Sequence, residues 1–174
     1  MKFGIIKERK NPPDRRVVFT PEELVRLQSE HPEAEIKVES SDIRIFSDDQ
    51  YRNLGLNVTA DMSDCDVLFG VKEVPVDALI PNKKYFFFSH TIKKQPYNRK
   101  LLQAILAKNI ELYDHETIVN ASNHRLIGFG RYAGLVGAYN GFRGFGIKYD
   151  LFTLPKAETL SGKEDLIARL KRQT

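Results

Sequence analysis

Short apolar runs alternate with amphipathic segments along the first two thirds of the chain. The runs KFGIIK, EIKVE, DVLFGV, YFFF and IELY occupy residues 2–7, 35–39, 66–71, 85–88 and 110–113. Brief apolar runs bounded by polar residues are typical of strands. Apart from Asp66, the runs at 66–71 and 85–88 are apolar throughout, as in a strand buried on both faces of a parallel sheet. We therefore predict strands at these positions.

Helix signals fall between these runs. Thr20-Pro21-Glu22-Glu23 combines an N-cap, a proline at the first position and acids in the first turn. Ser47 starts a second helix that Gly55 ends, and further helical patterns cover 76–80, 98–108 and 131–149. Alternating strands and helices predict an α/β fold with a doubly wound, mostly parallel sheet of about five strands and helices on both faces. A short additional strand is expected at 125–129.

The chain changes character at residue 151. A loop with a proline leads into a polar helix expected at 161–172, and Ser161 with Glu164 fits a capping box. We therefore divide the chain into a domain over residues 1–150 and a linker with a helix over 151–174.

Charge and composition exclude several classes of function. The net charge is +4 and the pI about 9.1, but acids are interleaved with the basic residues, which argues against nucleic-acid binding. No apolar run approaches the roughly 20 residues that span a membrane, and no secretory signal is visible. The single cysteine, Cys65, lies in an apolar run, which favours a buried side chain over a nucleophile. A chain with one cysteine cannot form an internal disulfide, which fits a reducing, cytoplasmic setting. Four histidines and one cysteine show no metal-ligand spacing, so no metal is predicted.

Polar residues follow three of the expected strands. Lys72 and Glu73, His90 and Lys93, and Asp114 and Glu116 each follow a run of apolar residues. The carboxyl ends of parallel strands share one edge of the sheet, where open α/β sheets bind ligands. Histidine titrates near neutrality, and a lysine beside carboxylates is a credible proton shuttle. Each residue alone is more simply a solvated or ion-paired side chain, but their shared edge favours an active site.

Arginines approach the same edge. Arg15 and Arg16 follow the loop after the first strand. A guanidinium there suits bidentate recognition of a carboxylate or phosphate, although a surface arginine pair fits the composition equally well. Arg125 belongs to the expected strand at 125–129 and is a weaker candidate.

The glycine-rich segment 128–146 raises the question of a nucleotide site. Gly128, Gly130 and Ala133 match the relaxed dinucleotide fingerprint GxGxxG/A. No long strand precedes this segment, and no acid follows about twenty residues later at the end of a second strand. A helix packed closely at its small residues is the better interpretation, so we predict no cofactor-binding unit within this chain.

Five segments together resemble one family. They are IKERKNPPDRRVVFTPEEL (6–24), GVKEVP (70–75), YFFFSHTIKKQ (85–95), LYDHETI (112–118) and RLIGFGRYAGLVGA (125–138). The chain resembles the N-terminal domain shared by alanine dehydrogenase and transhydrogenase. Within that group it is most similar to lysine-forming saccharopine dehydrogenase and lysine–oxoglutarate reductase.

The resemblance implies an enzyme that interconverts lysine plus 2-oxoglutarate and saccharopine through an imine, with NAD or NADP carrying hydride. It implies that Lys72 and His90 are the acid–base groups. It further implies that these residues contact substrate: Arg16, Glu73, Lys93, Glu116 and Arg125. The substrates are the small molecules lysine, 2-oxoglutarate and saccharopine.

The family also has a second, nucleotide-binding domain that holds most of the NAD or NADP. The resemblance places the first strand of that domain just after residue 174, so we expect these residues alone to be inactive. Two alternatives stay open: an alanine dehydrogenase or transhydrogenase domain, and a non-catalytic binding module of the same fold. The sequence leaves open the direction of the reaction, the choice between NAD and NADP, and the oligomeric state.

Overall fold

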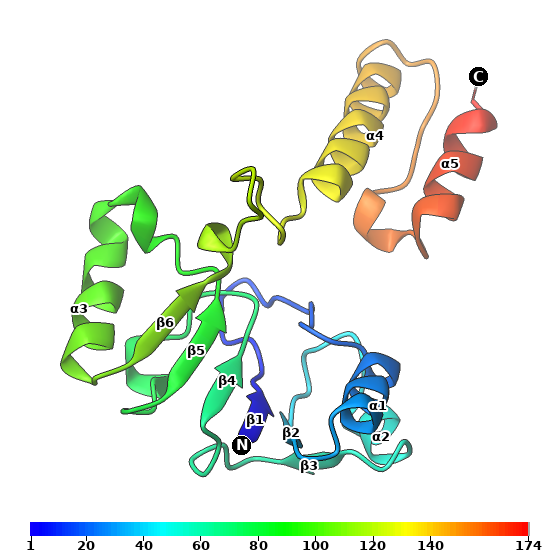
Figure 1. The fold of residues 1–174 in the computed structure, drawn as a ribbon. Helices are drawn as coiled ribbons and strands as arrows, with labels where there is room; N and C mark the ends of the chain where they lie inside the picture. Colours follow the sequence, from blue (N-terminus) through cyan, green and yellow to red (C-terminus); the bar gives the residue numbers. More distant parts are fainter. Residues whose placement is uncertain (174) are drawn as a thin grey trace. The chain divides into compact units, whose positions relative to one another are not determined.

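The structure is a computed structural model that describes residues 1–173 (Figure 1). The chain forms two compact units, one over residues 1–127 and one from Gly128 onward. Each unit is described by itself.

The first unit contains a six-stranded sheet in which all pairings are parallel. Its strand order is β3-β2-β1-β4-β5-β6, so the direction of winding reverses between β1 and β4. The strands are β1 Lys2–Ile5, β2 Glu35–Glu39, β3 Asn57–Thr59, β4 Val67–Phe69, β5 Lys84–Phe87 and β6 Glu111–Asp114. The predicted doubly wound α/β fold is confirmed.

Two strand predictions need correction. The short strand β3 was not predicted, because its three residues show no clear apolar pattern; it is defined by pairing with β2. The strand predicted at 125–129 is wrong: only an isolated antiparallel bridge joins Val119 to Arg125. The Asn120 side chain accepts hydrogen bonds from the backbone of Ser122 and His124, which closes a local turn instead of a strand.

Helices in the first unit begin where the capping signals lie. They are α1 Pro21–Glu30, α2 Asp48–Arg52 and α3 Arg99–Ala107. Thr20 and Ser47 form complete capping boxes with Glu23 and Gln50, and Gly55 has a φ of 82° after α2. The helix predicted at 76–80 is a single 3₁₀ turn, Val76–Ala78, between two prolines.

Helices cover both faces of the sheet, as predicted. Along β4, Leu68 packs into the apolar cluster that holds Leu101 and Ile105 of α3, whereas its neighbour Phe69 packs against the cluster of Leu24 from α1. Successive strand residues point to opposite faces, so the two clusters lie on opposite sides of the sheet. The carboxyl ends of the strands therefore remain as the edge at which loops can gather.

The second unit contains α4 Gly130–Lys148 and α5 Lys163–Lys171. Its core is formed by Tyr139, Leu154 and Leu166. The close packing predicted along the glycines of this helix occurs within this unit at Gly146, where an added Cβ would lie 2.5 Å from the Phe152 ring. It does not occur at Gly134, Gly137, Gly141 or Gly144, where an added Cβ would meet no atom within 4 Å.

The capping box predicted at Ser161 is wrong. The N-cap of α5 is Gly162, one residue later, and Ser161 donates its N–H to the Asp165 carboxylate instead. Among residues 1–173, no helix combines the length and apolar character needed to cross a bilayer.

Candidate active site

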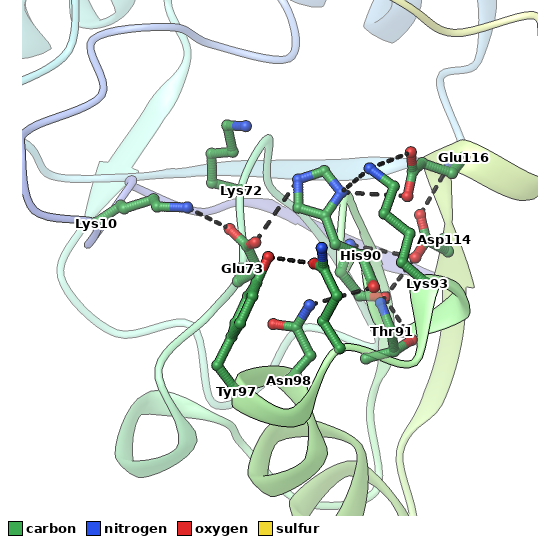
Figure 2. Close-up of polar contacts among 12 residues, drawn as sticks. Lys10, Lys72, Glu73, His90, Thr91, Lys93, Tyr97, Asn98, Asp114 and Glu116 are labelled. Carbon is green, nitrogen blue, oxygen red and sulfur yellow. Dashed lines mark hydrogen bonds and ion pairs between the residues drawn. The ribbon is translucent and has the colours of Figure 1, made fainter.

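Loops that follow β4, β5 and β6 converge at the carboxyl edge of the sheet (Figure 2). The buried side chain of Asp114 joins the last two: it accepts a hydrogen bond from the hydroxyl and backbone N–H of Ser89, just after β5. Its second oxygen accepts the N–H of Glu116 at 2.8 Å. Asp114 thus fixes the two segments that carry His90 and Glu116.

His90 lies between two carboxylates. Its Nδ1 is 3.1 Å from Oε2 of Glu116, and its Nε2 is 3.7 Å from Oε1 of Glu73 (Figure 2). The His90 backbone is left-handed, with a φ of 55°, and its carbonyl accepts a hydrogen bond from Asn98 at 3.2 Å. This backbone is uncommon in residues other than glycine, although histidine, asparagine and aspartate adopt it more readily than most. Each ring nitrogen of His90 therefore has a carboxylate nearby, and Nδ1 also lies 3.4 Å from Nζ of Lys93.

Glu116 gathers three cationic side chains. Its carboxylate contacts His90, the Lys93 ammonium at 3.2 Å and the Arg125 guanidinium, and its side chain is only 6% exposed. Burial would raise the pKa of Glu116, but the hydrogen bonds from His90, Lys93 and Arg125 outweigh it and hold this pKa at about 2. Glu116 is therefore ionised across the physiological range.

Glu73 has a cationic partner that sequence reasoning missed. Lys10, in the loop after β1, places its Nζ 3.1 Å from Oε2 of Glu73. The only local signal was the basic cluster KERK in a loop that had to return toward the sheet edge. Glu73 thus lies between Lys10 and His90.

Lys72 directly precedes Glu73. Its ammonium makes no hydrogen bond or ion pair with the described residues, 1–173, whereas its backbone N–H donates to Glu8 at 2.8 Å. The nearby positive charge of Lys72 contributes to lowering the pKa of Asp14, after the larger effect of hydrogen bonding from Arg16. Lys72 therefore offers an ammonium that can engage a ligand at this edge.

Arg16 is held by Asp14. Its Nε donates to Oδ1 of Asp14 at 2.8 Å, and its Nη2 contacts the other oxygen. This pairing of near neighbours orients the guanidinium, which stays 40% exposed at the side chain. Asp14 and Glu8 were both missed from the sequence, because nothing local distinguishes them from other loop acids.

The predicted site residues therefore form two groups. Glu73, His90, Lys93, Glu116 and Arg125 are joined by direct ion pairs or hydrogen bonds. Lys72 and Arg16 form the second group: Arg16 pairs with Asp14, whose pKa the charge of Lys72 also helps to lower, and Lys72 is joined to Glu73 of the first group by the peptide bond. The arrangement can exchange protons at His90 and Lys72 and attract anions to its cations.

Among residues 1–173, the glycine-rich segment at the start of α4 does not form the strand–turn–helix arrangement that binds a dinucleotide. Gly128 and Gly130 precede and begin α4, but a loop stands before them where the fingerprint requires a strand. Within residues 1–173, no cluster of three or more histidine, cysteine or acidic side chains is arranged to hold a metal.

Fold and site together define an α/β domain with a cluster of charged side chains at the carboxyl edge of a parallel sheet. Residues 4–136 match the family described as "Alanine dehydrogenase/PNT, N-terminal domain", and the chain belongs to this family. The predicted family resemblance is confirmed.

Curated relatives of the lysine-forming saccharopine dehydrogenase group are similar to this chain in sequence. The chain is 36% identical over 147 residues to alpha-aminoadipic semialdehyde synthase of Arabidopsis thaliana, an alignment that covers 82% of this chain and 14% of that protein. It is 26% identical over 146 residues to saccharopine dehydrogenase [NAD(+), L-lysine-forming] of Yarrowia lipolytica, covering 79% of this chain and 40% of that one. The chain thus spans well under half the length of these curated relatives.

Solved structures share the fold. An L-alanine dehydrogenase superposes with a TM-score of 0.60 at 18% identity, over 86% of this chain and 41% of that one. The transhydrogenase from Sinorhizobium meliloti gives 0.54 at 17% identity, over 87% of this chain and 42% of that one.

Proposed function

We propose that the chain is the substrate-binding and acid–base part of an oxidoreductase that interconverts lysine plus 2-oxoglutarate and saccharopine. The observation that carries this proposal is His90 held between Glu73 and Glu116, beside Lys72, whose ammonium makes no hydrogen bond or ion pair with residues 1–173. The names of the lysine-branch relatives support the choice of substrates.

Proton transfer is the task of His90 and Lys72. Forming or hydrolysing an imine moves protons on and off the substrate nitrogen and oxygen, and each positioned acid–base group contributes about 10²–10⁴-fold. The Glu116 carboxylate stabilises the imidazolium that His90 becomes when it takes up a proton. Glu73 faces the other ring nitrogen and can hold a substrate ammonium.

Cations at the edge match the charge of the substrates. 2-Oxoglutarate carries two carboxylates, and Arg16 has the planar fork that binds a carboxylate through two hydrogen bonds. Lys93 and Arg125, both about half exposed beside Glu116, add positive charge toward solvent. Substrate carboxylates can share these groups with Asp14 and Glu116.

A nicotinamide, when bound, supplies hydride chemistry that no side chain of this chain provides. Because no strand precedes the glycine-rich segment at Gly128 and Gly130, we assign NAD or NADP mainly to a further nucleotide-binding domain. In this assignment residues 1–150 are the substrate domain and 151–174 lead to that further domain.

The experiment is a substrate panel on the intact protein with NADH and NADPH. We expect oxidation of the nucleotide with lysine plus 2-oxoglutarate. Turnover with pyruvate plus ammonia alone would assign an alanine dehydrogenase activity, and transfer between two nucleotides a transhydrogenase. Absence of turnover in every combination would favour a non-catalytic module.

The same assay on residues 1–174 alone tests the domain assignment. We expect no nucleotide oxidation, because the site for the nicotinamide lies elsewhere. Measurable lysine- and 2-oxoglutarate-dependent oxidation of NADH by this fragment would contradict the assignment.

A further inference from the structure

Glu8 is a buried carboxylate beneath the segment that carries Lys72. It lies in the loop after β1 and is 8% exposed. Its Oε1 accepts the N–H of Val71 at 2.7 Å, and its Oε2 accepts the N–H of Lys72 at 2.8 Å. One side chain thus binds two successive backbone donors with its two oxygens.

The need for this side chain follows from where β1 ends. Ile6 makes the last hydrogen bond from the β1 side to β4, donating to the Phe69 carbonyl at 2.9 Å. Beyond that point no strand backbone accepts the donors of Val71 and Lys72, and a buried N–H without an acceptor is costly. The Glu8 carboxylate supplies the acceptors that a neighbouring strand would otherwise provide for these two N–H groups.

His115 holds the same segment from another side. Its Nε2 lies 3.1 Å from the Gly70 carbonyl, and the residue is 5% exposed. A carbonyl only accepts, so Nε2 carries the proton, while Nδ1 has no partner within residues 1–173. Phe88 donates its N–H to the Val71 carbonyl at 3.0 Å. The Gly70 N–H donates to the Phe86 carbonyl at 2.8 Å, so five backbone groups of residues 70–72 are fixed.

We propose that Glu8 is a positioning residue for Lys72, fixing the backbone from which the Lys72 ammonium reaches the site. This inference rests on the proposed acid–base role of Lys72. A lysine has a long flexible stem, so the location of its amine depends on a rigid base. Glu8 supplies that base by binding the N–H of Lys72 itself.

Glu39 provides a matched comparison. It is also a buried carboxylate at a strand end, 4% exposed, and it accepts the N–H of Lys7 at 2.9 Å. It pairs with Arg9 and has no hydrogen bond or ion pair with residues 70–73. Replacing Glu39 therefore removes a similar buried acceptor but leaves the hydrogen bonds of the Val71 and Lys72 backbone in place.

The experiment compares Glu8→Gln with Glu39→Gln in the intact protein. A glutamine has one acceptor oxygen, so one of the two donors loses its partner. We expect amide hydrogen exchange at one of the two residues, Val71 or Lys72, to be about 10–100-fold faster in Glu8→Gln, the range for losing one hydrogen bond to a charged group. We expect kcat to fall about tenfold or more while KM changes little. Glu39→Gln should leave both amides and kcat near wild type.

Three results would overturn the inference. Unchanged exchange at Val71 and Lys72 would show that Glu8 does not hold these two backbone N–H groups. A Glu8→Gln kcat equal to that of Glu39→Gln would show that Glu8 has a structural role only. A wild-type protein inactive on every substrate pair would overturn the proposed function itself, and the positioning role with it. Should Glu8→Gln fail to fold, Glu8→Asp beside Glu39→Asp makes the same comparison, because the shorter side chain withdraws both oxygens.

Discussion

Replacing Glu116 by glutamine removes the charge on which His90, Lys93 and Arg125 converge. The pKa of Glu116 is about 2 against an ordinary 4.5, because hydrogen bonds from these side chains outweigh the effect of burial. That difference equals about 3 kcal/mol at ~1.4 kcal/mol for each tenfold change in proton affinity. The Lys93 and Arg125 side chains are 48% and 50% exposed, so water screens their charges. We therefore expect Glu116→Gln to lower the free energy of unfolding by about 1–2 kcal/mol near neutral pH.

The effect depends on pH with a definite sign. A carboxylate whose pKa is lowered by folding stabilises the fold above its unfolded-state pKa, and this contribution disappears as pH falls through the folded-state pKa. For Glu116 the window runs from about 4.5 down to about 2. With these two values, less than half of the contribution remains at about pH 3.

Urea unfolding of wild type and Glu116→Gln at about pH 6.5 and about pH 3 measures this difference. Glu111→Gln is the control: Glu111 begins β6, the strand that precedes Glu116, is 60% exposed and pairs with Lys84 at 3.5 Å. We expect less than about 0.5 kcal/mol from the control at either pH. The electrostatic reasoning would be refuted if Glu116→Gln lowered the free energy of unfolding equally at both pH values. It would also be refuted if, at neutral pH, the loss were no larger than in Glu111→Gln.

Two further predictions concern the backbone. His90→Asn should lower kcat by ~10²–10⁴-fold, because it removes the acid–base group. The circular dichroism spectrum should not change, since asparagine also tolerates the left-handed backbone that His90 adopts. A kcat within threefold of wild type would contradict the acid–base role. Gly146→Ala and Gly137→Ala on α4 should have opposite effects in urea unfolding. The first places a Cβ 2.6 Å from the Phe152 carbonyl oxygen and costs about 1–3 kcal/mol, whereas the second has open space and gains up to ~1 kcal/mol of helix propensity. Equal effects would contradict the packing of the second unit.

The sheet was predictable because its signals are local. The short apolar runs at 66–71 and 85–88 are typical of strands covered on both faces, and they contain most of β4 and β5. Thr20 and Ser47 likewise start helices through hydrogen bonds three residues away. The strand expected at 125–129 failed because pairing, rather than composition, decides whether a short segment is a strand.

The site was only partly predictable because part of it depends on distant contacts. His90 and Glu116 follow strands, and the shared edge of a parallel sheet predicts that they meet. The bonds of Glu8 to the segment of Lys72 span 63 and 64 positions in sequence, and Lys10 reaches Glu73 across 63. No local pattern distinguishes such acids and lysines from solvated loop residues. Only the folded loops after β1 reveal them.

The acid–base role of Lys72 is tested most directly by kcat of the intact protein for lysine plus 2-oxoglutarate. Lys72→Met should lower kcat by ~10²-fold or more with the fold intact, since the Lys72 ammonium has no hydrogen bond or ion pair with residues 1–173. Lys83→Met, just before β5 at the opposite end of the sheet, should retain wild-type turnover. A Lys72→Met protein as active as Lys83→Met would contradict the account.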